Sequence, residues 1–136
     1  MNANKIVISV HDLEHLRRLI DASRRVGHRD AEHIDALEHE LDRAIVKHGK
    51  MPHGVVMLGS SVRLKDLDTG KELSYQIVLP KYANADEERI SVLAPIGTAL
   101  LGYKAGSVVE WAVPSRVRRL KILDVIPKQE SELVAA

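Results

Sequence analysis

Histidines are the residues of this 136-residue chain whose type and spacing most directly allow chemistry. Six of the seven lie in the N-terminal part of the chain: His11, His15, His28, His33, His39 and His48. The four-residue spacing of His11 and His15 puts two imidazoles on one helix face, which can hold zinc. Glu14 does not directly follow His11, so the HExxH pattern of zinc hydrolases is not formed. Solvated surface histidines are the favoured interpretation, and a histidine-based metal-binding protein or enzyme is the alternative function.

Two carboxylates, Asp21 and Asp30, flank a basic segment at residues 23–29. Paired carboxylates on a protruding segment could deliver Mg²⁺ to the active site of another protein. The arginines between them lower the local affinity for a cation, so helix caps and ion pairs are the favoured roles. The tip residues of this segment are Arg24, Arg25, His28 and Arg29.

A dense basic run at the start of a predicted strand consists of Arg116, Arg118, Arg119 and Lys121. Nucleic-acid platforms combine such charge with stacking aromatic side chains, and none lies within this run. A solvated strand edge is therefore the favoured interpretation. No nucleophile triad or phosphate-binding glycine loop is found at convincing spacing either, so we predict a non-enzymatic protein without a metal or cofactor.

Composition limits the classes of partner. The net charge of +1 provides no whole-molecule field for a nucleic acid or an anionic membrane, so any such partner would need a local patch. The absence of cysteine excludes disulfides and fits a reducing compartment. No stretch is long and apolar enough for a signal peptide or a membrane span, and we expect a cytoplasmic protein.

Periodicity predicts helices first and strands afterwards. Residues 5–10 form a predicted strand, with Ser9 and Asp12 resembling a capping box at the start of a helix that Gly27 ends. That helix carries an apolar stripe of Leu13, Leu16, Leu19 and Ile20, and a second helix, starting at Asp30, carries Ile34, Leu37, Leu41, Ala44 and Ile45. Gly49 and Pro52 form its stop signal. The two helices should pack as a short antiparallel hairpin.

After Pro52 the apolar period changes to two. Short strands are predicted at residues 55–58, 62–64, 73–79, 90–92, 108–113 and 120–125. Pro95 and Gly102 bound one short helix, whose Leu100 and Leu101 should bury on the sheet. The predicted class is α+β: a helical part at residues 1–50, a mostly antiparallel sheet around one helix at 51–127, and a loose tail at 128–136.

No charged residue occurs in segment 90–102. Burial of the short helix explains this for residues 98–102 but not for the residues before the helix. Ala94, Pro95 and Ile96 lie at the strand-to-helix corner, where the backbone is normally near the surface. An uncharged surface corner indicates an interaction module.

Ordered motifs give the chain a family resemblance. The C-terminal part resembles the C-terminal domain of the bacterial Gre transcript-cleavage factors through Gly59-Ser60-Ser61-Val62, Leu67-Asp68, Tyr75-Gln76-Ile77-Val78, residues 90–96 and Leu100-Leu101-Gly102. Met51-Pro52-His53, the short helical pair and the total length look closer still to the regulator of nucleoside diphosphate kinase family, Rnk.

The resemblance implies an FKBP-like C-terminal domain, an N-terminal antiparallel coiled coil, and binding to RNA polymerase at the rim of its secondary channel. It implies that the docking surface includes Ala94, Pro95 and Ile96. Competition with Gre-type factors is expected. FKBP-like folds also host prolyl isomerases, but their pockets are built from aromatics, which are scarce here. We expect a monomer without direct DNA or membrane contacts.

Two departures from the Gre pattern limit what the resemblance implies. Gre factors carry acidic residues at the tip of a longer coiled coil to hold catalytic Mg²⁺, whereas the arms here are short and the tip is rich in arginine. Stimulation of transcript cleavage is therefore not expected. Ser115 and Arg116 replace the glycine pair that usually follows the proline matching Pro114.

Overall fold

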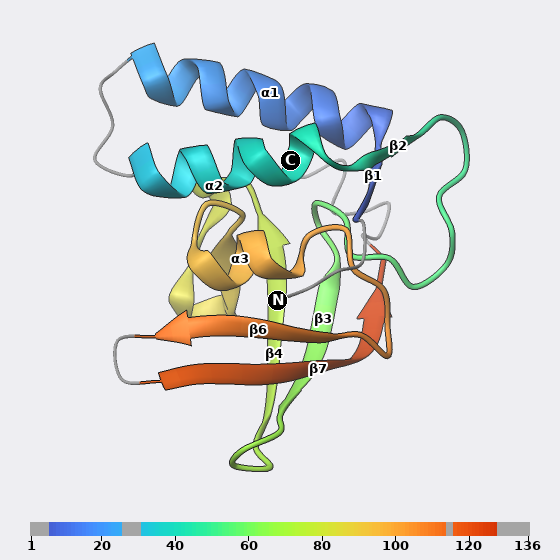
Figure 1. Cartoon of the computed structure of the whole chain (residues 1–136), viewed down its shortest axis with the longest axis vertical. Helices are drawn as coiled ribbons and strands as arrows, with labels where there is room; N and C mark the ends of the chain where they lie inside the picture. Colours follow the sequence, from blue (N-terminus) through green and yellow to red (C-terminus); the bar gives the residue numbers. More distant parts are fainter. Residues whose placement is uncertain (1–5, 26–30, 114–115, 128–136) are drawn as a thin grey trace.

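A mixed helix and sheet architecture appears in the computed structural model, which describes residues 6–25, 31–113 and 116–127 (Figure 1). The helices are α1 (Val10–Arg25), α2 (Ala31–Asp42) and α3 (Pro95–Leu100), with 3-10 turns η1 (Pro80–Tyr82) and η2 (Ala85–Glu87). The strands are β1 (Val7–Ser9), β2 (Ile45–Lys47), β3 (Ser61–Asp66), β4 (Glu72–Val78), β5 (Arg89–Ser91), β6 (Val108–Val113) and β7 (Arg116–Ile126).

The main sheet has five strands in the order β5-β4-β3-β7-β6. The β4 and β5 strands pair in parallel, and the other neighbours pair antiparallel. The β3–β7 register shifts between Arg63 and Leu64, which bends the long β7 strand. The predicted α+β class, with a helical N-terminal part and a mostly antiparallel sheet, is confirmed.

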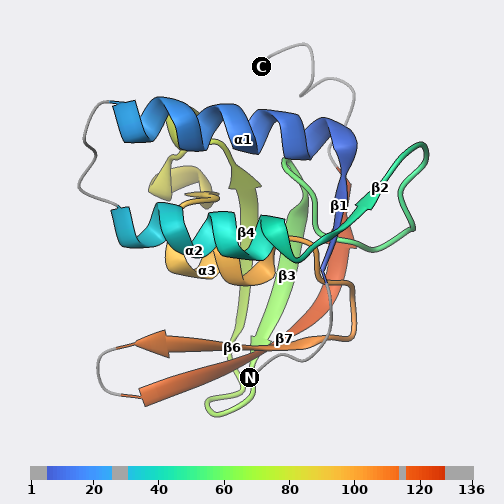
Figure 2. The same ribbon diagram turned by 45° about the horizontal axis from the view of Figure 1, so that its top comes forward.

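The helices α1 and α2 lie side by side and run in opposite directions, with α2 between α1 and α3 (Figures 1 and 2). Ser9 caps α1, since its Oγ accepts a hydrogen bond from the Asp12 backbone N–H at 3.1 Å. The apolar stripes of the two helices face inward, and their buried members are Leu16, Ile20, Ile34, Leu37 and Leu41. Burial of these stripes holds the helices on the rest of the chain.

The second helix is shorter than predicted. It ends at Asp42, and the following apolar residues form β2, which pairs in parallel with β1 in a separate two-stranded sheet. Ile45 donates its backbone N–H to the carbonyl of Ile6 at 2.9 Å, and 49% of its surface is exposed. Its assignment to the helical stripe was wrong, because a backbone partner distant in sequence turns the chain into a strand.

The predicted strand at residues 55–58 is also wrong. The structure has one isolated bridge there, between Val55 and Lys104. Val56 donates its N–H to the Tyr103 carbonyl at 2.8 Å, and Met57 N–H donates to Ser60 Oγ at 2.9 Å, which folds the segment into a turn. The valines are buried without being part of a ladder.

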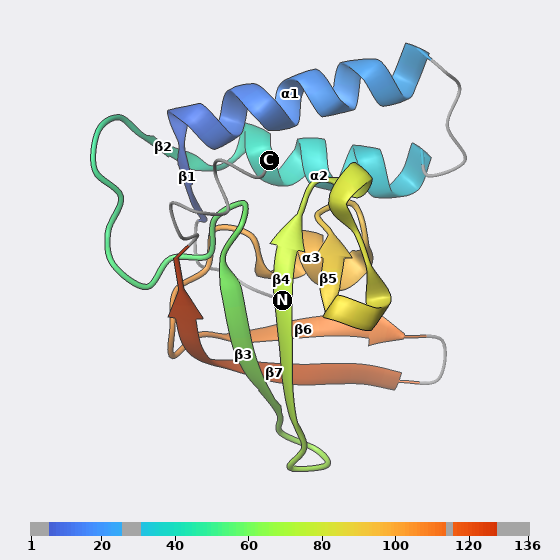
Figure 3. The ribbon, with the colours of Figure 1, turned by 180° about the vertical axis from the view of Figure 1, so that it is seen from behind.

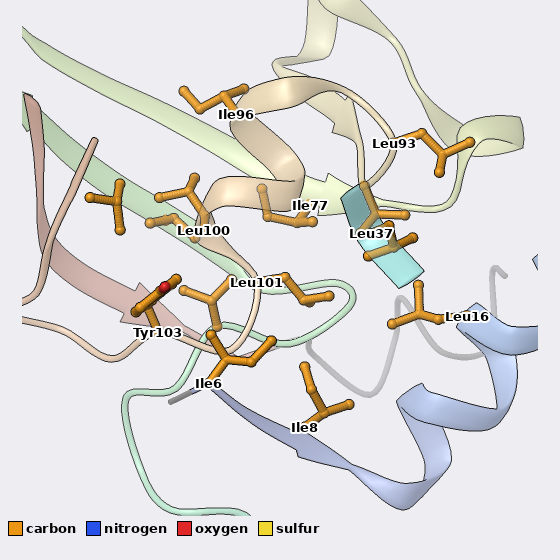
Figure 4. Close-up of a cluster of buried hydrophobic side chains, with 14 of the residues drawn as sticks. Ile6, Ile8, Leu16, Leu37, Ile77, Leu93, Ile96, Leu100, Leu101 and Tyr103 are labelled. Atoms are coloured by element: carbon orange, nitrogen blue, oxygen red, sulfur yellow. The ribbon is translucent and has the colours of Figure 1, made fainter. Parts of the chain in front are cut away.

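One continuous core joins the N-terminal elements to the sheet. Ile6 and Ile8 lead into α1 and lie near Leu101 and Tyr103, which follow α3 (Figure 4). Backbone bonds reinforce this junction, since Val7 N–H donates to the Gly102 carbonyl at 3.1 Å. The boundary at residue 50 stays a prediction, and the tail at 128–136 lies outside the described residues.

None of the described helices has the length and apolar character needed to cross a membrane.

Candidate functional site

The corner between β5 and α3 presents a small uncharged surface. Pro95 is exposed at the first position of the helix and Ala94 is half-buried before it. Ile96, by contrast, is only 6% exposed and belongs to the core cluster (Figure 4). Burial therefore accounts for the missing charge at Ile96, and the accessible part of the corner is Ala94 and Pro95.

Short local hydrogen bonds hold the corner in one shape. Ala94 N–H donates to the Ser91 carbonyl at 3.0 Å, and Leu93 N–H donates to Ser91 Oγ at 3.0 Å. The hydroxyl of Thr98 donates to the Val92 carbonyl at 2.7 Å. These bonds tie the first turn of α3 to the end of β5, so the surface is formed before any partner binds.

Gly97 allows this close approach of helix and strand. A β-carbon at this position would overlap the carbonyl oxygen of Ser91 and press on the backbone of Val92. Any larger residue would push the first turn of α3 away from β5. The presentation of Pro95 therefore depends on a residue that does not itself reach the surface.

Arg24, one of the tip residues, joins the two helices. Its guanidinium donates to Glu38 at 2.8 and 2.9 Å and to Asp35 at 2.7 Å. The hydrogen bond from Arg24 lowers the pKa of Glu38, and the same bond raises the pKa of Arg24. Arg25 is exposed, whereas His28 and Arg29 lie outside the described residues. Arg24 thus binds the acids of α2.

The rings of His11 and His15 lie edge to face with centroids 4.8 Å apart. His11 is exposed and His15 is half-buried. Within the described part of the chain no group of three histidine or carboxylate side chains is arranged to hold a metal ion. This contact between the two rings is a relationship that the four-residue spacing alone did not establish.

The basic run on β7 has acidic partners that its sequence pattern did not reveal. Arg118 donates to Oδ2 of Asp66 at 2.9 and 3.1 Å, and Arg119 donates to Asp68 at 2.9 Å. The pKa of Asp66, which is 1% exposed, is lowered by the Asp68 backbone N–H first and by Arg118 as well. Two cations of the run are thereby neutralised, which agrees with a structural role.

Asp12 is a further residue whose role the sequence did not reveal. It lies in the first turn of α1, where an acid suits the helix dipole. Its carboxylate also accepts the Leu58 backbone N–H at 3.0 Å, and the residue is 7% exposed. It therefore connects the N-terminal helix to the segment that leads into the sheet, and no local pattern predicts a partner so distant in sequence.

Comparison with known proteins assigns the two parts of the chain. Residues 51–127 match the family described as "Transcription elongation factor, GreA/GreB, C-term", and residues 4–46 match "Rnk N-terminus". The chain belongs to the GreA/GreB C-terminal family and carries an Rnk N-terminus. The resemblance stated from the sequence motifs is confirmed for this Rnk-type chain.

Individual relatives support the same assignment. A protein of Escherichia coli strain K12, "Regulator of nucleoside diphosphate kinase", is 33% identical over 127 residues, 92% of the Rnk-type chain and 91% of the relative. A "Transcription elongation factor GreA" of Clostridium botulinum strain Eklund 17B is 40% identical over 90 residues, 65% of this chain. The match spans only 56% of that GreA relative.

A solved structure extends the likeness to three dimensions. The "Prokaryotic transcription elongation factor GreA/GreB from Nitrosomonas europaea" superposes with a TM-score of 0.71 and is 35% identical in sequence. The match covers 91% of the Rnk-type chain and 99% of the Nitrosomonas europaea protein. The relatives are named as regulators or factors rather than enzymes. The fold is therefore of the GreA/GreB C-terminal type, and the protein is a transcription-associated regulator by homology.

Proposed function

We propose that the protein is a non-enzymatic transcription modulator that binds RNA polymerase near its secondary channel. The observation that carries this proposal is the match of residues 51–127 to the GreA/GreB C-terminal family together with an Rnk N-terminus. Within that part the exposed, preformed corner at Ala94 and Pro95 serves as the docking surface, and Ile96 supports it from the core. The protein competes with Gre-type factors for this site.

The proposed function does not include stimulation of transcript cleavage. That activity needs carboxylates free to hold a metal ion near the end of the helical pair. Here Asp35 and Glu38 are both bound to Arg24. The Arg24 guanidinium offsets one of these two negative charges and occupies both oxygens of Glu38 and one of Asp35, which disfavours recruitment of Mg²⁺ by this pair. Of the two acids that flank the basic segment, Asp21 is exposed on α1 and Asp30 lies outside the described residues.

We take the sheet with α3 to be an FKBP-like domain and the pair α1 and α2 to be a short coiled-coil hairpin. In the bound state α3 presents the corner to polymerase, and the hairpin lies at the channel rim. The protein acts in this way as a cytoplasmic monomer.

A binding experiment with core RNA polymerase tests the proposal. Fluorescently labelled protein is titrated with polymerase, a Gre factor is added as competitor, and transcript cleavage in stalled complexes is followed in the same samples. We expect saturable binding that the Gre factor displaces, without cleavage above the polymerase background. Failure to bind at micromolar concentration, or cleavage comparable to that with the Gre factor, would refute it.

A further inference from the structure

A cluster of basic side chains lies away from the docking corner. Acidic residues are absent between Asp42 and Asp66 in the sequence. The loop that leaves β2 crosses this interval, and it stands out from the body of the molecule (Figures 1 and 3). The basic loop cluster consists of Lys47, His48, Lys50 and His53 from this loop and Lys104 from the turn after α3.

Backbone contacts bring the two segments of the cluster together. Val55 and Lys104 form an isolated antiparallel bridge, and Ala105 N–H donates to the Gly54 carbonyl at 2.9 Å. His53 therefore lies on a segment directly beside the one that carries Lys104. At the other end of the loop, Lys47 is held in β2 by its pairing with Ser9 of β1. The loop is anchored at both ends.

The charges of the cluster are not neutralised by the rest of the described chain. All five side chains are exposed, and none forms an ion pair with another described residue. Eight arginines of the described chain do form ion pairs with carboxylates: Arg17, Arg18, Arg24, Arg43, Arg63, Arg89, Arg118 and Arg119. Within the residues that the structure describes, carboxylates thus pair with arginines, and the three lysines of the cluster remain available to an external anion.

We propose that the basic loop cluster binds the phosphate backbone of a nucleic acid without reading its sequence. Lysine ammonium groups act as point charges on flexible stems, which suits a row of phosphates. No Phe, Tyr or Trp lies between Ile45 and Gly59, so base stacking is limited to the rings of His48 and His53. The residues that dominate protein–protein interfaces are enriched in Trp, Tyr and Arg, and the cluster contains none of these, which favours a nucleic acid over a protein partner.

This proposal revises the expectation that the protein makes no direct DNA contact. That expectation rested on a net charge of +1, which averages an acid-rich helical part with an acid-free loop. The revision does not depend on polymerase binding, because the cluster and the corner at Pro95 are separate surfaces. An experiment can therefore refute nucleic-acid binding by the cluster without refuting polymerase binding by the corner, and the reverse also holds.

The test measures binding of the full-length protein to labelled oligonucleotides by fluorescence anisotropy, without polymerase. A single-stranded RNA 20-mer and a 20-base-pair DNA duplex are compared at 50 to 200 mM salt. We expect weak binding, with a dissociation constant on the order of 10 to 100 µM at the lowest salt. Three lysine contacts predict a slope of log K against log salt of about −2 for the single strand.

Two variants with the same change in charge locate the site. In the cluster variant, Lys50→Gln and Lys104→Gln are combined, and in the control variant Lys71→Gln and Lys81→Gln are combined. All four lysines are exposed. We expect the cluster variant to lose at least fivefold in affinity and its salt slope to fall to about −0.7, since one phosphate contact remains. The control variant should keep affinity within about twofold of the original.

Three results would overturn the proposal. The first is no binding to either oligonucleotide at 500 µM protein and low salt, and the second is equal loss of affinity in both variants. In the third, polyglutamate of equal charge competes as well as RNA, which would assign the cluster to an acidic protein segment. Binding that favours RNA or DNA would identify which nucleic acid supplies the phosphates.

Discussion

Gly102 lies so close to Ile6 that a β-carbon built on the glycine would stand 2.5 Å from the β-carbon of Ile6. The glycine has φ of +86°, and its carbonyl accepts the Val7 N–H. The turn after α3 and the strand before α1 are therefore in direct backbone contact. Only a residue without a side chain fits between them.

Gly102→Ala is expected to destabilise the protein more than Gly106→Ala does. Gly106 has φ of +93°, and nothing lies within 4 Å of its missing β-carbon, so this control carries only the conformational strain of about 1–2 kcal/mol. The Gly102 variant adds an overpacking cost of about 1–3 kcal/mol. Urea unfolding of both variants measures the difference, and equal free energies of unfolding would contradict the close contact.

Asp12→Ala is expected to lower the free energy of unfolding by about 1–3 kcal/mol, because the Leu58 N–H loses its acceptor in a partly buried setting. Asp12→Asn keeps an acceptor oxygen at this position and should lose less. Thermal and urea unfolding give both values. An asparagine variant as unstable as the alanine variant would show that charge, rather than the hydrogen bond, is what Asp12 contributes.

Arg24→Ala is expected to destabilise the helical pair at neutral pH and to matter less in acid. Arg24 lowers the pKa of Glu38, so the stabilisation is complete above the unfolded glutamate value of about 4.3. It is lost as the pH falls through the lower folded value. Urea midpoints measured from pH 7 to pH 3 should therefore converge for the original protein and the variant.

The control for that series is Arg25→Ala, because Arg25 is exposed and forms no ion pair with another described residue. Its midpoints should follow those of the original protein throughout. If the Arg24 variant differs from the original protein by the same amount at every pH, the bonds to Asp35 and Glu38 do not stabilise the fold.

Pro95→Glu is expected to weaken polymerase binding at least tenfold while the fold is retained. Pro95 is exposed, and an acid at the start of a helix is tolerated, so the variant places a charge on the proposed apolar contact. Ser74→Glu puts the same charge on an exposed residue of β4 and should bind normally. Equal affinity of the two folded variants for polymerase would remove the corner from the docking surface.

Ile96 is unsuitable for such a test. Its side chain packs in the core, so an aspartate there would bury an unpaired charge and unfold the corner. Ile96→Ala should cost about 2–4 kcal/mol of stability. Loss of binding in either variant would report on folding rather than on docking.

Local patterns predicted those parts of the fold that local forces determine. Ser9 caps the first helix, and Pro95 starts the short helix. The end of the second helix could not be predicted, because Ile45 fits a helical stripe as well as a strand. Its conformation is decided by the carbonyl of Ile6, which is remote in sequence.

The same limit applies to the candidate site. An uncharged corner was visible in the sequence, but its periodicity could not show that Ile96 points inward while Pro95 faces solvent. The pairing of Arg118 with Asp66 depends on the alignment of β3 and β7, so the basic run seemed unpaired. The sequence shows which residues are charged. Whether a charge is neutralised depends on the register between strands, which brings its partner to it.

The shared core also has a consequence for the order of events during synthesis. Both N-terminal helices leave the ribosome early, yet Ile6 and Leu37 belong to a core that includes Leu93, Leu101 and Tyr103. At roughly 5–20 residues per second those partners emerge only seconds later. The apolar stripe of the nascent helical segment therefore lacks its native partners during that interval, and its packing is completed only when the later residues have been made.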